Sequence, residues 1–247
     1  MEKESAIWRS ARGEKCVGTG QIHVWRADLS MAAQAADNLE PLLADGERER
    51  AVRYPRQEDR RRFIAARAIL RQVLAHYIGN RPENLSFVYG EHGKPALAGD
   101  LGHERLEFNM SHSGEMALYA VARSRRVGVD IEYPRPKVNY MRIAERFFSI
   151  EEFEELTALP TEAQCAAFYR CWTHKEAYVK ARGDGIAAGL GTFSVSLEEC
   201  SKLLRSDDGP DEIDRWRFLA LEPGGQYVAA LCVAGQDMEL SCFEWSL

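Results

Sequence analysis

The chain has 247 residues, of which 45% are hydrophobic, and its formal net charge is −6. Such a chain can bury one large core or two smaller ones, and its acidic balance argues against bulk nucleic-acid binding. No apolar run approaches the roughly 18 to 20 residues of a membrane span, and the first residues lack the apolar core of a signal peptide. We therefore expect a cytoplasmic protein with neither nucleic acid nor membrane as a partner.

The predicted elements begin after residues 1–20, whose mixed charge and lack of period predict a poorly ordered extension. Arginine is concentrated between 47 and 71, where Pro55 is expected to separate two helices. Strands are predicted at 21–27, 85–89, 106–111, 115–122, 126–133, 192–198, 214–221, 226–233 and 238–245. Later helices are predicted at 139–147, 150–158 and 162–181. Each half is therefore expected to pack helices on a mainly antiparallel sheet, which is an α+β fold.

Six cysteines are scattered along the chain without a C-x-x-C pair or any Cys/His metal spacing. This distribution is typical of reduced thiols that pack as small apolar residues. The sequence therefore predicts no disulfide framework.

Asp130 and Glu132 lie in the strand predicted at 126–133. The period of two in a strand puts both carboxylates on one face and the apolar Val129 and Ile131 on the other. Like charges at that distance raise each other's pKa unless a cation intervenes, and a hard divalent metal is the simplest such cation. The alternative is a solvated strand face with no ligand.

The longest predicted helix carries an aromatic, an acid and a base on one face. Thr161 and Gln164 are predicted to form a capping box at its start. Trp172, Glu176 and Lys180 follow at i, i+4 and i+8. Glu and Lys at this spacing usually form an ordinary surface pair, but a tryptophan on the same stripe indicates that the face is not fully solvated.

Three other side chains have both a structural and a functional interpretation. Arg67 lies at the edge of an apolar helix stripe, where an arginine commonly snorkels. His112 lies between Ser111 and Ser113 on the apolar face of its strand, where a buried, hydrogen-bonded histidine is the simpler interpretation. Lys94 lies in a turn-rich segment and, taken alone, is an ordinary loop lysine.

Four sequence blocks occur in order: G-K-P at 93–95, F-N-M-S-H-S at 108–113, G-V-D-I-E at 128–132 and W-x-x-K-E-A-x-x-K at 172–180. The series resembles the motifs of 4′-phosphopantetheinyl transferases of the surfactin-synthetase-activating type. The resemblance extends from about residue 40 to about residue 200. The resemblance implies two similar α/β subdomains related by a pseudo-twofold axis, with the active site in the cleft between them. The N-terminal subdomain (21–124) would bind coenzyme A, and the C-terminal subdomain (125–247) would carry the metal and catalytic residues.

The resemblance also assigns roles to individual residues. Coenzyme A, the co-substrate, would be bound by Arg67 at its 3′-phosphate and by Lys94, Ser111 and His112. The cofactor Mg²⁺ would be held by Asp130, Glu132 and Glu176. Glu176 would also be the catalytic base, directly or through a metal-bound water, and the second catalytic residue, Lys180, would offset charge on the leaving phosphate.

The expected reaction moves phosphopantetheine from coenzyme A to a serine of an apo acyl, peptidyl or aryl carrier and releases 3′,5′-adenosine bisphosphate. Such carriers serve fatty-acid, polyketide or nonribosomal-peptide biosynthesis. Two alternatives are a metal-dependent phosphohydrolase of a pyrophosphate nucleotide and an inactive nucleotide-binding relative. Because the resemblance is to a family with two fused halves, we expect a monomer.

An acidic carrier protein is expected to dock on residues 135–148, where basic side chains surround apolar ones. Alternatively, Phe147 and Phe148 belong to the core and the basic residues form a solvated face.

Overall fold

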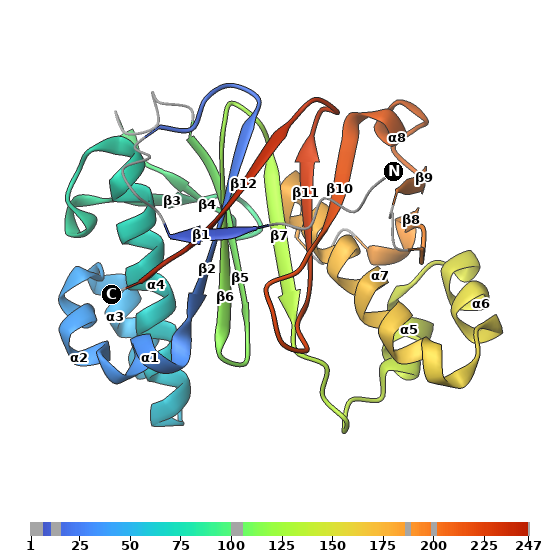
Figure 1. Cartoon of the computed structure of the whole chain (residues 1–247), viewed down its shortest axis with the longest axis horizontal. Helices are drawn as coiled ribbons and strands as arrows, with labels where there is room; N and C mark the ends of the chain where they lie inside the picture. The colour runs from blue at the N-terminus through green and yellow to red at the C-terminus, as the bar shows by residue number, and fades with distance from the viewer. Residues whose placement is uncertain (1–6, 11–15, 100–105, 186–188, 199–201, 247) are drawn as a thin grey trace.

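Two helices of 22 residues each, α4 (Gln57–Ile78) and α7 (Thr161–Arg182), organise the fold. The computed structural model describes residues 7–10, 16–99, 106–185, 189–198 and 202–246. Each helix packs on its own sheet, and the sheets lie between the two groups of helices (Figure 1). Both helices end at a glycine with positive φ, Gly79 at 63° and Gly183 at 85°, a backbone conformation that favours glycine.

The N-terminal subdomain is built on a five-stranded sheet with the strand order β1-β12-β2-β6-β5. Its strands are β1 (Trp8–Ser10), β2 (Gln21–Asp28), β5 (Leu106–Ser113), β6 (Met116–Arg123) and β12 (Glu239–Glu244). Before α4 come the helices α1 (Leu29–Gln34), α2 (Ala36–Leu39) and α3 (Asp45–Val52). A separate antiparallel pair is formed by β3 (Phe87–Tyr89) and β4 (Pro95–Leu97).

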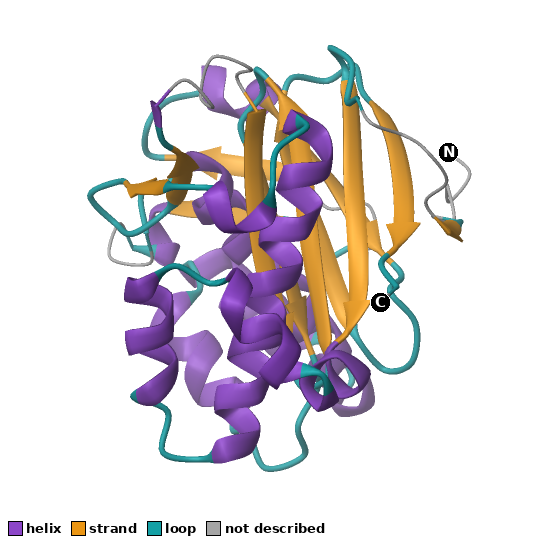
Figure 2. Cartoon of the chain, turned by 90° about the vertical axis from the view of Figure 1, so that its left-hand side faces the viewer, coloured by secondary structure: helices purple, strands orange, loops and turns teal. Residues whose placement is uncertain are grey.

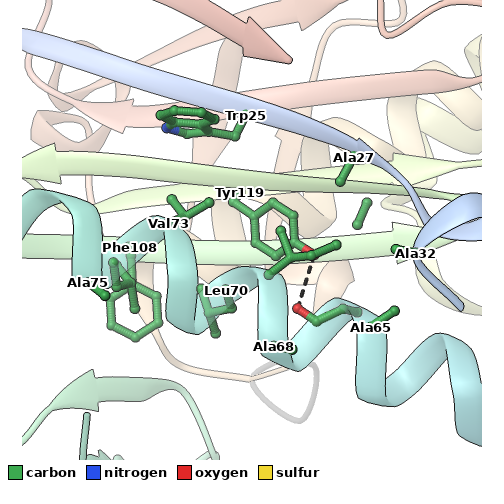
Figure 3. Close-up of a cluster of buried hydrophobic side chains, with 14 of the residues drawn as sticks. Trp25, Ala27, Ala32, Ala65, Ala68, Leu70, Val73, Ala75, Phe108 and Tyr119 are labelled. Atoms are coloured by element: carbon green, nitrogen blue, oxygen red, sulfur yellow. Dashed lines mark hydrogen bonds between the residues drawn. The ribbon is translucent and has the colours of Figure 1, made fainter. Parts of the chain in front are cut away.

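The core of this subdomain lies between α4 and the sheet (Figure 3). Ala65 and Ala68 are fully or almost fully buried on α4, and their small side chains let the helix approach the strands closely. The buried Tyr119 of β6 donates its hydroxyl proton to the backbone carbonyl of Ala66 at 3.0 Å, so the only polar atom of this side chain is satisfied.

The C-terminal subdomain is built on the antiparallel sheet β10-β11-β7. Its strands are β7 (Val127–Glu132), β10 (Trp216–Leu221) and β11 (Val228–Ala234). Besides α7 it contains α5 (Tyr140–Phe147), α6 (Ile150–Ala158) and α8 (Asp211–Arg215), with a second antiparallel pair, β8 (Phe193–Val195) and β9 (Leu203–Ser206). In Figure 2 the helices lie largely to one side of the strands.

The last strand, β12, crosses from the C-terminal part of the chain into the N-terminal sheet. Cys242 pairs in parallel with Val24 of β2 on one side and with Trp8 of β1 on the other. A division of the chain into 21–124 and 125–247 therefore leaves this strand with the wrong sheet. Part of the extension predicted to be poorly ordered, residues 1–20, forms strand β1. Residues 1–6 and 11–15 of that extension lie outside the described residues.

Most predicted elements agree with the structure to within three residues, and α3 and α4 do flank Pro55. The predicted capping box of Thr161 and Gln164 at the start of α7 is wrong. Thr161 is already helical, because Pro160 takes the N-cap position, and the Gln164 amide donates instead to the Leu159 carbonyl at 3.0 Å. The sequence prediction also omitted α1, α2, α8, β4 and β9, which are all six residues or shorter.

The two subdomains meet where β5 and β7 lie side by side. One face of β7 joins a hydrophobic cluster shared by both sheets, in which Val129 and Ile131 are buried against Leu118 and Val24. Since side chains alternate along a strand, Asp130 points to the opposite face, toward α7. The strand at the boundary therefore directs its carboxylates toward the helix that carries Glu176 and Lys180.

Candidate active site

A close approach of α7 to β7 assembles the candidate site. A Cβ at Gly128 would lie 2.1 Å from the Ala177 carbonyl oxygen and 2.4 Å from the Ala181 nitrogen, so only glycine fits there without moving the helix. This contact sets Glu176 and Lys180 over the strand face that carries Asp130.

Asp130 lies in a buried charge cluster formed by three elements. Lys180 Nζ donates to Asp130 Oδ1 at 2.6 Å and to Ser111 Oγ at 2.9 Å, while Ser111 Oγ donates to the same Asp130 oxygen at 2.8 Å. Asp130 is 3% exposed, so the ammonium offsets a carboxylate charge that would otherwise be costly to bury. Ser111, predicted to bind coenzyme A, is therefore hydrogen-bonded to Asp130 and Lys180 in this structure.

Glu132 lies two residues further along β7, at the edge of the cluster. Ser113 Oγ of β5 donates to Glu132 Oε2 at 2.9 Å. Burial raises the pKa of Glu132, and the negative charge of Asp130 raises it further, as expected for two carboxylates on one strand face.

Glu176 is buried on α7, and burial raises its pKa to about 7. The positive charge of Lys180 opposes this shift, whereas the charges of Asp130 and Glu132 add to it. A carboxylate with this pKa can accept a proton near neutral pH, which is what a general base requires. Glu176 is thus the residue of the cluster best suited to proton transfer.

The donor set suits a hard divalent cation, although the three predicted ligands are not gathered into a metal centre. Within the described ranges, no group of three or more His, Cys, Asp or Glu side chains could hold a metal ion. Two buried oxygens, Asp130 Oδ2 and Glu176 Oε1, have no hydrogen-bond partner among those residues. Carboxylate oxygens are the ligands Mg²⁺ prefers, so the residues present fit this ion by chemistry.

A pocket of about 470 Å³ opens beside the cluster, between the two subdomains. Its lining from β5, β7 and the turns after them includes His112, Ser113, Gly114, Glu132 and Tyr133. Its aromatic and apolar lining consists of Tyr54, Phe63, Val138, Ile143, Phe168, Tyr169 and Trp172. Asp59, Arg62 and Arg135 add charged groups to the lining. This combination of aromatic walls with polar and charged groups is typical of a small-molecule site.

His112 lies at the mouth of this pocket in a positively charged environment. The side chain is exposed, yet desolvation by its surroundings lowers the pKa of His112, and the charges of Lys180 and Arg50 lower it further. Arg50 was not singled out by the sequence, because nothing distinguishes it from the other arginines of 47–71. It lies over the ring of Phe63, which lines the pocket, 5.4 Å from the ring centroid.

Two predicted coenzyme A ligands lie outside the pocket. Arg67 is 11% exposed and forms an ion pair with Glu47, its Nε donating at 2.8 Å. Lys94 Nζ donates to the carbonyl oxygens of Ala181 at 3.0 Å and Val127 at 3.3 Å, at the end of α7 and the start of β7. Neither Arg67 nor Lys94 is therefore among the residues that line the pocket with His112.

Comparison with known proteins identifies the family of this chain. Residues 126–232 match the model of the 4′-phosphopantetheinyl transferase superfamily, and residues 25–124 match the model of the 4′-phosphopantetheinyl transferase N-terminal domain. The chain is 40% identical to 4′-phosphopantetheinyl transferase HetI of Nostoc sp., over 87% of this chain and 88% of the relative. It is 29% identical to 4′-phosphopantetheinyl transferase Sfp of Bacillus subtilis, over 85% and 90%.

The chain therefore belongs to the 4′-phosphopantetheinyl transferase family, and it is an enzyme that transfers phosphopantetheine to carrier proteins. Neither the phosphohydrolase nor the inactive relative is favoured by these matches. In the part of the chain that the structure describes, no helix has the length and apolar character needed to cross a membrane.

Proposed function

We propose that this enzyme moves 4′-phosphopantetheine from coenzyme A to a serine hydroxyl of an acidic carrier protein in the cytoplasm, acting as a monomer. The observation that carries the proposal is the position of Glu176, a base of near-neutral pKa, over the Asp130–Glu132 strand and next to an open pocket. The nucleophile comes from the carrier, so this chain has to position a pyrophosphate, accept one proton and neutralise charge.

Glu176 is the proposed proton acceptor. The carrier serine oxygen attacks the phosphorus that bears pantetheine, its proton passes to the Glu176 carboxylate, and the bond from that phosphorus to the bridging pyrophosphate oxygen breaks. The departing 3′,5′-adenosine bisphosphate carries away the bonding electron pair. Lys180, whose ammonium is already in the cluster, stabilises the negative charge that develops on the phosphates.

Mg²⁺ is the proposed cofactor, and Asp130, Glu132 and Glu176 would hold it. When bound, the ion neutralises charge on the pyrophosphate. The two unpartnered buried oxygens, Asp130 Oδ2 and Glu176 Oε1, support this assignment. Lys180 Nζ donates to the other oxygen of Asp130, Oδ1, so Oδ2 is the Asp130 oxygen that would bind the ion.

The phosphates of coenzyme A are proposed to meet His112, Lys180 and Arg50. Burial lowers the pKa of His112, the positive charges of Lys180 and Arg50 lower it further, and a bound anion would offset these charges. Arg67 and Lys94 would bind coenzyme A with the N–H groups that their present partners leave unused.

The carrier is proposed to dock on residues 135–148. Arg135, Lys137, Arg142 and Arg146 are exposed on this segment and can meet an acidic partner. The apolar part of the surface is smaller than expected: Phe148 is buried in the core, and Phe147 packs edge to face on Trp172 with ring centroids 6.0 Å apart. Electrostatics therefore dominates this proposed surface.

A transfer assay tests the proposed reaction. The protein is incubated with coenzyme A, Mg²⁺ and an apo carrier, and the carrier is weighed; we expect a gain of about 340 Da, the mass of the group transferred in this phosphoryl transfer. Replacing the carrier's acceptor serine by alanine is the control. Release of phosphate products with no gain in carrier mass would indicate a phosphohydrolase instead.

A further inference from the structure

Side chains of β5 replace a backbone ladder at the boundary between the two sheets. Asn109 Oδ1 accepts a hydrogen bond from the Val129 backbone N–H at 3.0 Å, and Ser113 Oγ accepts one from the Tyr133 N–H at 3.1 Å. The two acceptors are four residues apart on β5, and the two donors are also four residues apart, Val129 within β7 and Tyr133 directly after it. The N-terminal subdomain thus holds the strand of the catalytic carboxylates in register through alternate side chains.

Ser113 differs from Asn109 because it also touches a carboxylate. A serine hydroxyl has one proton to donate. Since the Tyr133 N–H already donates to Ser113 Oγ, that proton is directed to Glu132 Oε2, 2.9 Å away. Both bonds are partly buried at the wall of the pocket, and Ser113 itself is 6% exposed. The orientation of the Glu132 carboxylate is therefore fixed by a residue of the other subdomain.

We infer that Ser113 is a positioning residue for Glu132: it ties one carboxylate oxygen to β5 and leaves the other to a divalent cation. This inference rests on the proposed function in that Glu132 is taken as a Mg²⁺ ligand. Residues that orient a metal ligand through a hydrogen bond typically contribute 10- to 100-fold to metal affinity. Ser111, which donates to Asp130, belongs to the same strand two residues earlier.

The test compares two boundary variants of the full chain by calorimetric titration with Mg²⁺ alone, without coenzyme A. Ser113→Ala removes the bond from the Tyr133 backbone N–H and the bond to Glu132, whereas the matched control, Asn109→Ala, removes only the bond from the Val129 backbone N–H. We expect Ser113→Ala to weaken Mg²⁺ binding about tenfold or more, and Asn109→Ala to change it less than about threefold.

Two further measurements separate positioning from a loss of structure. Ser113→Thr keeps the hydroxyl and should restore most of the Mg²⁺ affinity; in the transfer assay, Ser113→Ala should raise the KM for Mg²⁺ more than the KM for coenzyme A. If Ser113→Ala does not fold, Ser113→Cys, which keeps the side-chain volume with a weaker donor, replaces it in the comparison.

Mg²⁺ affinity of Ser113→Ala equal to that of the unchanged protein would overturn the inference, as would equal losses in Ser113→Ala and Asn109→Ala. Absence of Mg²⁺ binding by the unchanged protein would overturn it too. The proposed function fails separately, if the unchanged protein transfers no phosphopantetheine while its Mg²⁺ binding still depends on Ser113.

Discussion

Lys175 Nζ donates to both carboxylate oxygens of Glu152, at 2.7 Å each, and the two side chains are 0% and 2% exposed. The same ammonium donates to the Phe193 carbonyl, so one buried cation joins α7, α6 and β8. Lys175 directly precedes Glu176. This ion pair therefore fixes the rotation of α7 that points the next residue at the active site.

The first prediction concerns that ion pair. Lys175→Met leaves the Glu152 carboxylate buried without its counter-charge, so the free energy of unfolding should fall by about 3 to 5 kcal/mol. Urea unfolding measures it. Lys202→Met, at an exposed lysine, is the control and should change stability by no more than about 0.5 kcal/mol. A loss below 1 kcal/mol in Lys175→Met would show that the pair does not stabilise the fold.

The second prediction concerns acid. Burial lowers the pKa of His174 to about 4, and its Nδ1–H donates to the Arg170 carbonyl at 2.7 Å. In the unfolded chain, His174 therefore becomes protonated near pH 6.5, whereas in the folded chain it stays neutral until the pH falls to about 4. This term, present above pH 6.5, is lost as pH falls toward 4 and amounts to about 3 kcal/mol.

His174→Gln removes this titration while keeping an amide donor for the carbonyl. Between pH 7 and pH 4, the unfolding free energy of the unchanged protein should therefore fall by about 3 kcal/mol more than that of His174→Gln. Urea unfolding at several pH values measures the difference. A gap that stays constant with pH would contradict the assignment.

The third prediction concerns Glu176, whose titration makes the fold less stable as pH rises, the opposite of the effect of His174. Its folded pKa of about 7 lies above the unfolded value of 4.5, so its charging destabilises the fold as pH rises from 4.5 to 7. Glu176→Gln should remove up to about 3 kcal/mol of this cost at pH 7 and above, in metal-free buffer. Turnover should nevertheless fall at least about 10²-fold, as for the loss of a general base.

For Glu176→Gln, the KM for coenzyme A is the internal control and should change less than turnover does. If affinity for coenzyme A collapses while turnover at saturation survives, Glu176 binds substrate and is not the base.

The fourth prediction concerns the contact between α7 and β7. Gly128→Ala places a methyl group against the helix backbone, so α7 must shift, with a loss of about 1 to 3 kcal/mol and a larger proportional loss of turnover. Gly46→Ala on α3 is the matched control: its Cβ meets nothing within 4 Å, and it should be neutral or stabilising. Thermal unfolding and turnover are compared; equal behaviour of the two variants would refute the role of Gly128.

The fifth prediction concerns carrier docking. Reversing Arg142 and Arg146 to Glu should slow carrier association and remove much of its dependence on salt, because exposed charges steer the encounter. The KM for coenzyme A should not change. Lys202→Glu, a reversal outside the docking segment, is the control. A carrier KM that is unaffected at low salt would place the docking surface elsewhere.

The sequence predicted those parts of the site that depend on local periodicity. Asp130 and Glu132 lie on one strand face, and Glu176 and Lys180 on one helix face, because strand and helix periods fix these relations. The residues that meet across long stretches of sequence were not predictable in this way. Arg67 pairs with Glu47 on another helix, and no local pattern indicates that an acid from α3 satisfies it.

The same distinction applies to the fold. The pattern of 238–245 predicts a strand but not its neighbours, and β12 pairs with strands more than 200 residues earlier in the chain. Short β1 (Trp8–Ser10) has no recognisable alternation, and its strand conformation depends on β12 being there. Periodicity thus determined what each segment becomes, whereas pairing was determined by contacts distant in sequence.

The position of β12 imposes an order on folding. During synthesis, the N-terminal sheet lacks β12, the strand between β1 and β2, until residues 239–244 have emerged from the ribosome. Until then the outer edge of β2 presents unpaired backbone groups, which makes the nascent chain prone to pairing with other chains. The subdomain that is synthesised first is therefore completed last, and the lifetime of that exposed edge is set by the rate at which translation finishes.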